Sequence, residues 1–516
     1  MKTGYLFLSI VLAVGMLITG CGTITPTSTA TPAPTAAAQP SSGATAASAT
    51  PAATLPDYEI NWYMPNTVQP DQEAVNAELS KITKEKINAT LNVHIIDWGS
   101  YDQKMQVMMA SASDMDLIFT SNWSNDYISG VNKSAYLEIT QDMLTKYAPN
   151  MLANVPEKCW PAAYINGKLY ALLNIQVEGR TPGLIMQKQY ADKYGLDISK
   201  VTKLSDLTDF YTKVRAGEPD LIPFETTSTT TLFNDIAVSY GMEVFSQNNP
   251  AAVYINDDSA KVMNYFAAPE TKEFLTLMRD WYTKGIIRSD AVTVKDDSAD
   301  LKAGKVVSLP QVINPDTAAN QAAKMNLKPA DLVTPVFTKT FMATGTIINT
   351  LTAISTTSKD PERCLMLYNL LYDSNDTKLF NMMSYGIEGK HYTLDGDVVV
   401  PIANSGYSVA CGWEYGNMFN SYRQSADQPK WYPVGPDMNN TAIVSKLLGF
   451  SFNPEPVKTE LAQCASVVSE YYSPLFNGAV DPDTVLPEFL QKLDNAGAQK
   501  IIDEIQSQID AWKAGK

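Results

Sequence analysis

The segment from residue 58 to residue 120 constrains the fold most, because predicted strands and helices alternate along it. The predicted strands are 58–64, 91–97 and 116–120, and the predicted helices are 72–86 and 101–111. Strands that alternate with helices at this spacing form right-handed β-α-β units, which build a parallel sheet. The sequence therefore predicts an α/β fold that begins with a parallel sheet.

The carboxyl ends of these strands carry polar and aromatic side chains. The three ends read Pro65-Asn66-Thr67, Trp98-Gly99 and Ser121-Asn122-Trp123. Ligands of parallel sheets bind beyond the carboxyl ends of the strands. We therefore predict that Asn66, Trp98, Asn122 and Trp123 bind a ligand. The alternative for each is a solvent loop or a ring packed in the core.

The chain is long enough for more than one folding unit. The part from Asp57 to Lys516 has about 460 residues, which exceeds one hydrophobic core and predicts two domains or lobes. A strand at 183–187 is expected to leave the first lobe. The other expected elements are helices at 203–214, 232–240, 271–283, 361–372, 459–472 and 494–512, a helix-to-strand step at 300–309, and a β-rich stretch at 345–355.

The first twenty residues have the pattern of a secretory signal. Lys2 is the only charge before an apolar run, Tyr5–Ile18, that is shorter than the roughly 20 residues of a membrane-spanning helix. The sequence then reads Leu17-Ile18-Thr19-Gly20-Cys21, which resembles the lipobox of bacterial lipoproteins. This resemblance implies a signal peptide over 1–20 and fatty-acid chains, such as palmitate, on Cys21. The alternative is an ordinary signal peptide followed by a chance cysteine.

Residues 21–56 predict a disordered linker. They consist almost wholly of Ala, Thr, Pro and Ser, and no charge occurs before Asp57. Such a segment buries too little apolar surface to fold, and as a flexible coil it would span on the order of 30 Å. A lipid anchor with a tether of this length predicts the extracellular face of the cell membrane, and favours a Gram-positive type of surface over a periplasm.

Charge and motifs exclude several classes of function. The net charge of −16 at pH 7 argues against nucleic acid and anionic lipid as partners. The two histidines, His94 and His391, stand far apart, and no GxSxG, HExxH, Walker A or GxGxxG motif occurs. The acidic run from Asp296 to Asp300 lacks the spacing and the glycine of an EF-hand. We therefore expect no catalytic residue, no metal, no cofactor and no enzyme activity.

The cysteines leave the redox state open. Beside Cys21 the chain has Cys159, Cys364, Cys411 and Cys464, without a CxxC pair. In an exported chain these four could form two disulfides, with three possible pairings, or remain four thiols. The sequence does not decide between these alternatives.

Several ordered segments together resemble the family 1 extracellular solute-binding proteins of ABC importers. The segments are 116–118, 136–140, 165–172, 353–355 and 358–362. Three more, at 385–392, 448–450 and 456–460, resemble the LipO-type lipoprotein subfamily, which has an extra C-terminal domain. One departure is Met186-Gln187-Lys188, where the family often has Tyr-Asn-Lys. Any ligand contact that the Tyr-Asn pair makes in the family is therefore in doubt here.

The resemblance implies a two-lobe, periplasmic-binding-protein-like α/β fold with a hinge, an interlobe cleft and helical C-terminal elements. The expected boundaries are 57–182 for the first part of lobe 1, 183–345 for lobe 2, and 346–516 for a return to lobe 1 with aromatic loops and C-terminal helices. The implied function is capture of an extracellular solute, most often an oligosaccharide, by hinge closure for import. The implied partners are the membrane subunits of the importer and the solute, bound by a monomer.

Aromatic and polar side chains elsewhere are further candidates for sugar binding. Sugars offer apolar ring faces and many hydroxyls, so their sites combine flat aromatics with amides, carboxylates and guanidinium groups. The further candidates are Tyr164, Tyr170, Glu388, His391, Trp413, Asn417, Arg423 and Trp431. The alternative for each is packing within a lobe. The alternative functions are binding of a peptide or another polar solute and, in another class, a surface glycoside hydrolase or an interaction protein without a small ligand.

Overall fold

The structure is a computed structural model that describes residues 55–515. The expected signal peptide, Cys21 and nearly all of the expected linker lie outside the described residues. Within residues 55–515, no helix combines the length and the apolar character needed to cross a membrane.

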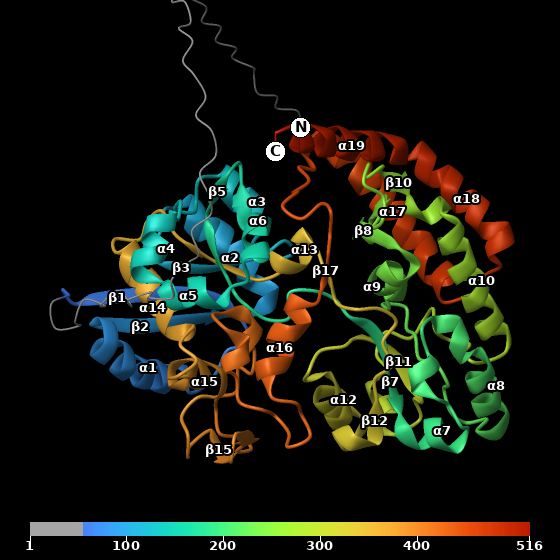
Figure 1. Ribbon diagram of the computed structural model, residues 1–516, viewed down its shortest axis with the longest axis horizontal. Coiled ribbons are helices and arrows are strands. Elements are labelled where there is room, and N and C mark those ends of the chain that lie inside the picture. The colour runs from blue at the N-terminus through green and yellow to red at the C-terminus, as the bar shows by residue number, and fades with distance from the viewer. Residues whose placement is uncertain (1–54, 516) are drawn as a thin grey trace, which may run out of the picture. The chain divides into compact units, whose positions relative to one another are not determined.

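The first part of the described chain builds a five-stranded sheet (Figure 1). Its strands run in the order β2-β1-β3-β14-β6. The strand β1 (Tyr58–Pro65) pairs in parallel with β2 (Ala89–Ile96) and β3 (Leu117–Thr120), as the alternation of elements predicts. The other two, β14 (Leu351–Ile354) and β6 (Ala171–Leu173), are antiparallel to their neighbours. The carboxyl ends of β1, β2 and β3 therefore meet at one edge of the sheet.

Helices and short strands complete this first unit. They are α1 (Gln72–Ile87), α2 (Trp98–Ala110), α3 (Tyr127–Asn132), α4 (Gln141–Tyr147), α5 (Pro149–Asn154), α6 (Trp160–Ala163), β4 (Tyr164–Ile165), β5 (Lys168–Leu169), α13 (Thr344–Ile347), α14 (Pro361–Leu371), α15 (Lys378–Tyr385), β15 (Tyr392–Asp395), β16 (Val398–Pro401) and α16 (Trp431–Asn440). The expected β-rich stretch at 345–355 is therefore α13 followed by β14.

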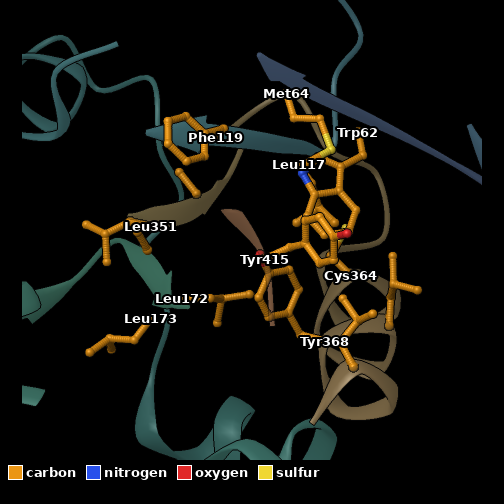
Figure 2. Packing of buried hydrophobic residues seen from close by; sticks show 14 of the residues in the cluster. Trp62, Met64, Leu117, Phe119, Leu172, Leu173, Leu351, Cys364, Tyr368 and Tyr415 are labelled. Carbon is orange, nitrogen blue, oxygen red and sulfur yellow. The ribbon is translucent and has the colours of Figure 1, made fainter. Parts of the chain in front are cut away.

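The first core lies between this sheet and α14 (Figure 2). Trp62 of β1 is fully buried and packs against Tyr368 of α14 and Tyr415, with ring centroids 5.5 Å and 6.1 Å away. Full burial of one such apolar side chain stabilises the fold by about 1.5–3 kcal/mol. This core packs against the strands and so holds their ends in place.

A second core forms around residues 184–337. Its sheets have the orders β11-β7-β12 and β10-β9-β8. The elements are β7 (Pro182–Gln187), α7 (Lys188–Lys193), α8 (Thr208–Gly217), α9 (Leu232–Ile236), β8 (Met242–Ser246), β9 (Asn249–Tyr254), β10 (Met263–Asn264), α10 (Pro269–Thr283), α11 (Ser298–Lys302), β11 (Ser308–Val312), α12 (Thr317–Met325) and β12 (Leu332–Val333). The strand expected at 183–187 is β7, and it begins this second unit.

The C-terminal helices also belong to the second core. They are α17 (Lys458–Phe476), α18 (Pro482–Asn495) and α19 (Ala498–Ala514), and α17 and α18 lie beside α10 (Figure 1). The sequence led us to expect two helices here, in a segment that stays with lobe 1. The helix α18 was missed because Pro482 and Pro487, which stand at its start and inside it, weaken the helical signal. Its Phe489 packs edge-on against Phe266 of the second core, with centroids 4.9 Å apart.

The chain passes between the two cores three times. The passages lie between Ile175 and Leu184, between Phe337 and Met342, and between Trp431 and Leu447. They meet at β13 (Phe341–Met342), which pairs in parallel with β17 (Ile443–Val444), while Arg180 forms an antiparallel bridge with Phe341. The first two passages lie near the expected boundaries at 182 and 345, and the third was not expected.

The four cysteines of the described chain are free thiols. Cys159, Cys364 and Cys464 are buried, and Cys411 is half-buried. In this structure the alternative with two disulfides does not occur.

Candidate solute-binding cleft

A cleft of about 1110 Å³ lies between elements of the two cores. On the first side it is lined by the turn after β3, by α3 and by α13. On the second side it is lined by α9, β8 and residues 450–455. Its lining residues include Asn122, Trp123, Arg180, Asp235 and Glu243. Of the three strand ends that were expected to present a ligand, the end of β3 lines the cleft with Asn122 and Trp123, whereas Asn66 and Trp98 are not among the lining residues.

Three tryptophans that the sequence analysis selected lie together beside this cleft. The ring of Trp98 stacks on Trp123 at 5.7 Å and on Trp413 at 6.0 Å between centroids, and Trp123 and Trp413 lie 6.4 Å apart. We call these three residues the tryptophan cluster. Aromatic pairs at such distances add about 0.5–1.5 kcal/mol beyond their buried area. Trp123 is 49 % exposed, so the cluster offers a free ring to the cleft.

Each ring of the cluster is placed by its own element. Trp98 is the first residue of α2, and Asp97 caps that helix by accepting from the amide of Gly99 at 3.0 Å. Trp123 follows β3, and its Nε1 donates to the carbonyl of Asn349 at 2.9 Å. Phe119 supports Trp123 and Trp413 from below, edge-on, at 6.1 Å and 6.2 Å.

The two predicted asparagines differ in accessibility. Asn122 is exposed in the cleft, and its Nδ2 donates to the carbonyl of Gly345 at 2.9 Å. Asn66 is buried, and its Nδ2 donates to Oε1 of Glu414 at 3.2 Å. Asn122 can therefore meet a solute directly, whereas Asn66 holds a neighbouring side chain.

Acidic side chains line the far side of the cleft. Asp235 of α9 pairs with Arg180 at 2.5 Å between Oδ1 and Nη1, and burial raises the pKa of Asp235. Burial also raises the pKa of Glu243 on β8 to about 7, and Ser445 donates its hydroxyl to Oε2 of Glu243 at 2.5 Å. A carboxyl of this kind accepts or donates a hydrogen bond near neutral pH, which suits the hydroxyls of a solute.

Tyr164 and Tyr170 lie outside this cleft. Tyr164 lines a second cavity of about 980 Å³ together with Trp160 and Trp512. Tyr170 packs against the first core, and its amide donates to the hydroxyl of Tyr127 at 3.2 Å.

Glu388 and His391 lie in a turn that packs on α1. Glu388 is exposed and is not among the cleft residues. His391 is buried, its Nδ1 accepts from the amide of Ile387 at 2.8 Å, and its Nε2 lies 3.2 Å from Oδ2 of Asp71. The histidine thus ties the turn to the start of α1.

Asn417, Arg423 and Trp431 are used inside the first unit. Asn417 is fully buried and donates to the hydroxyl of Tyr432 at 2.7 Å. Arg423 pairs with Asp397 and donates to the carbonyl of Gln428 at 3.1 Å. Trp431 is 4 % exposed and packs on Phe419 at 6.2 Å between centroids.

Sequence reasoning missed Arg180, Asp235, Glu243 and Glu414. Arg180 had a usable signal, because it precedes the strand that was expected to leave the first lobe. Asp235 and Glu243 lie in the second unit, and they line the same cleft as Trp123 only because the two cores lie next to each other. Nothing in the sequence around Asp235 or Glu243 indicates that these residues lie across the cleft from Trp123.

Comparisons with known proteins agree with this architecture. Residues 446–514 match the family model described as a domain of unknown function, DUF3502. A carbohydrate ABC transporter substrate-binding protein of Streptococcus pneumoniae serotype 4 (strain ATCC BAA-334 / TIGR4) is 27 % identical over 449 residues, which cover 85 % of this chain and 88 % of that protein.

Solved structures match as well. The N-glycan transport solute-binding protein of Streptococcus pneumoniae is 25 % identical, with a TM-score of 0.77 over 89 % of this chain and 100 % of that one. The same protein in complex with Man1GlcNAc matches with a TM-score of 0.67 at 25 % identity, over 88 % and 99 % of the two chains. These relatives are binding proteins, which agrees with the expectation that the chain is not an enzyme. Fold and comparisons together show that the chain is similar, over most of its length, to two-lobe solute-binding proteins of ABC importers.

Proposed function

We propose that the chain captures an extracellular oligosaccharide in the cleft and delivers it to the membrane subunits of an ABC importer. The observation that carries this proposal is the tryptophan cluster, with Trp123 exposed at the strand ends. Sugar rings pack their apolar faces on such indoles, and their hydroxyls pair with amides and carboxyls. One relative is named for carbohydrate transport and another is bound to Man1GlcNAc, which supports a sugar over a peptide or another polar solute.

The proposed contacts come from both walls of the cleft. On the first wall we assign Trp123 as the platform and Asn122 as a hydroxyl partner, with Trp98 and Trp413 completing the platform. On the second wall we assign Asp235 and Glu243 as hydroxyl partners. Of the remaining predicted residues, Tyr164 is assigned to the second cavity, and Glu388 and Arg423 to the surface of the first unit. Packing is assigned to Tyr170, His391, Asn417 and Trp431, and support of the cluster to Asn66.

Closure of the two lobes is the proposed capture step. Lobe 1 comprises 57–182 and the return from 346 to the third passage, and lobe 2 comprises 183–345 with the C-terminal helices. The three passages that meet at β13 form the hinge. A solute that contacts both walls binds the closed form more tightly, so it shifts the population toward closure without any chemical step.

We further propose that the chain acts as a monomer tethered to the cell surface. In this proposal residues 1–20 are a signal peptide, Cys21 carries the lipid, and the linker to residue 56 lets the lobes reach the importer. The support is the lipobox-like segment and the uncharged composition of the linker. Two or three acyl chains give lasting anchorage, which a single chain does not.

Isothermal calorimetry on residues 57–516 tests the binding proposal with Man1GlcNAc, other oligosaccharides and peptides. Ligand at 100 times its dissociation constant would also add about 2.7 kcal/mol of stability, which a thermal-shift screen detects. The matched control is Trp160→Ala, because this tryptophan lines the second cavity. We expect sugar binding that Trp123→Ala weakens and Trp160→Ala leaves intact. If only peptides gave a heat of binding, the sugar proposal would be refuted. Release of cleaved sugar would indicate the hydrolase alternative.

A further inference from the structure

Glu414 is a buried carboxyl beside the tryptophan cluster. It has no exposed surface, and it is not among the residues that line the cleft. Its Oε1 accepts from Nδ2 of Asn66 at 3.2 Å, while Oε2 has no hydrogen-bond partner in residues 55–515. A carboxylate in this position would lose its hydration without a compensating charge, so the neutral acid is the stable form.

The groups that face Glu414 bring no positive charge. Hydrogen bonds from Cys411 and Asn66 lower the pKa of Glu414, but burial outweighs them. Burial and, to a lesser degree, Glu414 raise the pKa values of the phenols of Tyr101, Tyr407 and Tyr415. The thiol and these phenols are neutral or, after losing a proton, negative. Burial raises the pKa of Glu414 to about 9. The carboxyl therefore carries its proton at neutral pH and ionises only in alkali.

The turn that carries Glu414 also carries Trp413. Both lie in the 3-10 turn η8 (Gly412–Glu414). The side chain of Glu414 reaches Asn66 at the end of β1, and its backbone carbonyl accepts from Nδ2 of Asn174, beyond β6, at 2.7 Å. Two strands of the sheet thus fix the turn, and the turn places the Trp413 ring 6.0 Å from Trp98.

We propose that Glu414, held as a neutral acid, is a positioning residue that keeps Trp413 in the tryptophan cluster and that releases it on ionisation. A charged Oε2 draws water or a cation toward a closed site, and the turn must open to admit either. The platform for the solute then loses one of its rings. The effect on solute binding rests on the proposed function, whereas the effect on the cluster does not.

Near-ultraviolet circular dichroism of the ligand-free protein tests the structural part. We expect the tryptophan signal of the wild type to change with a midpoint near pH 9, and Glu414→Gln to lack this transition, because the amide keeps the shape and cannot ionise. Ionisation of exposed tyrosines occurs in both proteins and cancels in their difference. Burial holds the pKa values of Tyr101, Tyr407 and Tyr415, the phenols beside Glu414, well above their usual range, so these three stay protonated near the midpoint. The variant Trp413→Phe, which keeps Glu414, tests whether Trp413 gives the signal. If it does, the transition must be absent from this variant. The same transition in wild type and Glu414→Gln would overturn the proposal.

Calorimetry with Man1GlcNAc at about pH 7 and about pH 10 tests the functional part. We expect the affinity of the wild type to fall about tenfold, and that of Glu414→Gln to stay within about twofold. A wild-type affinity that does not change with pH would overturn the link to binding. If Man1GlcNAc does not bind at either pH, the proposed function fails for this sugar, and the circular dichroism result still decides the role of Glu414.

Discussion

Two aromatic regions of the first unit look alike in sequence and differ in use. The strand ends carry Trp98 and Trp123, and the loops from 411 to 436 carry Trp413 and Trp431. Trp98, Trp123 and Trp413 gather beside the cleft, whereas Trp431 is buried against Phe419. Both tryptophans of the strand ends lie beside the cleft, but only one of the two in the loops does. The difference teaches that the aromatic density of a segment does not by itself place a ring at the cleft. The experiments below test this contrast, in order of decreasing effect.

Replacement of Trp431 should have the largest effect, and on stability alone. Trp431→Ala removes a ring that is 4 % exposed and leaves a cavity beside Phe419. We expect a loss of about 3–5 kcal/mol in the free energy of unfolding. Urea unfolding measures it, and calorimetry below the transition should return the wild-type affinity. A lower affinity in the folded variant would place Trp431 in the binding machinery and would break the contrast.

Replacement of Trp123 should show the opposite pattern. The ring is 49 % exposed, so Trp123→Ala loses little buried area. It removes the proposed platform for the solute, and we expect a loss of about 2 kcal/mol in binding free energy, or roughly thirtyfold in affinity. Calorimetry measures the loss and urea unfolding serves as the control. A variant with wild-type affinity would place the solute elsewhere, and the second cavity lined by Trp160 would be the next candidate.

Ionisation of Glu243 should give a pH-dependent effect on stability at the far wall. Burial raises the pKa of Glu243 to about 7, so the folded protein holds this proton up to a higher pH than the unfolded chain does. Because the unfolded state then binds fewer protons, this group lowers the stability as the pH rises from about 4.5 to about 7. Glu243→Gln should remove that part of the slope in unfolding experiments across this range. Equal slopes for both proteins would contradict the raised pKa.

The parts of the site that lie at strand ends could be predicted from the sequence. The alternation of strands and helices predicted the parallel pairing of β1 with β2 and β3, and with it the edge where Asn122 and Trp123 lie. The sequence did not predict that the C-terminal helices join the second core, because α18 contains prolines and its contacts are with α10, about 200 residues away.

The acidic residues of the far wall and Glu414, which supports the tryptophan cluster, could not be predicted, and the reason is a different one. Asp235 and Glu243 reach the cleft only through packing of two separate cores. Glu414 meets Asn66 across 348 positions of the chain, and a single buried carboxyl has no periodic pattern. Local periodicity indicates elements and their ends, whereas contacts between distant elements depend on the packed structure.

The smallest effect should come from the surface pair in the aromatic loops. Arg423 donates to Asp397, and both side chains keep contact with solvent, with exposed fractions of 20 % and 43 %. Exposed ion pairs contribute about 0–1 kcal/mol, so we expect Arg423→Gln to cost less than about 1 kcal/mol of stability. Since Arg423 points to the backbone of Gln428 and not to the cleft, the affinity for Man1GlcNAc should not change. A peptide solute would require a fixed charge for its terminus, and loss of peptide binding in Arg423→Gln would therefore reverse the ranking of the two regions.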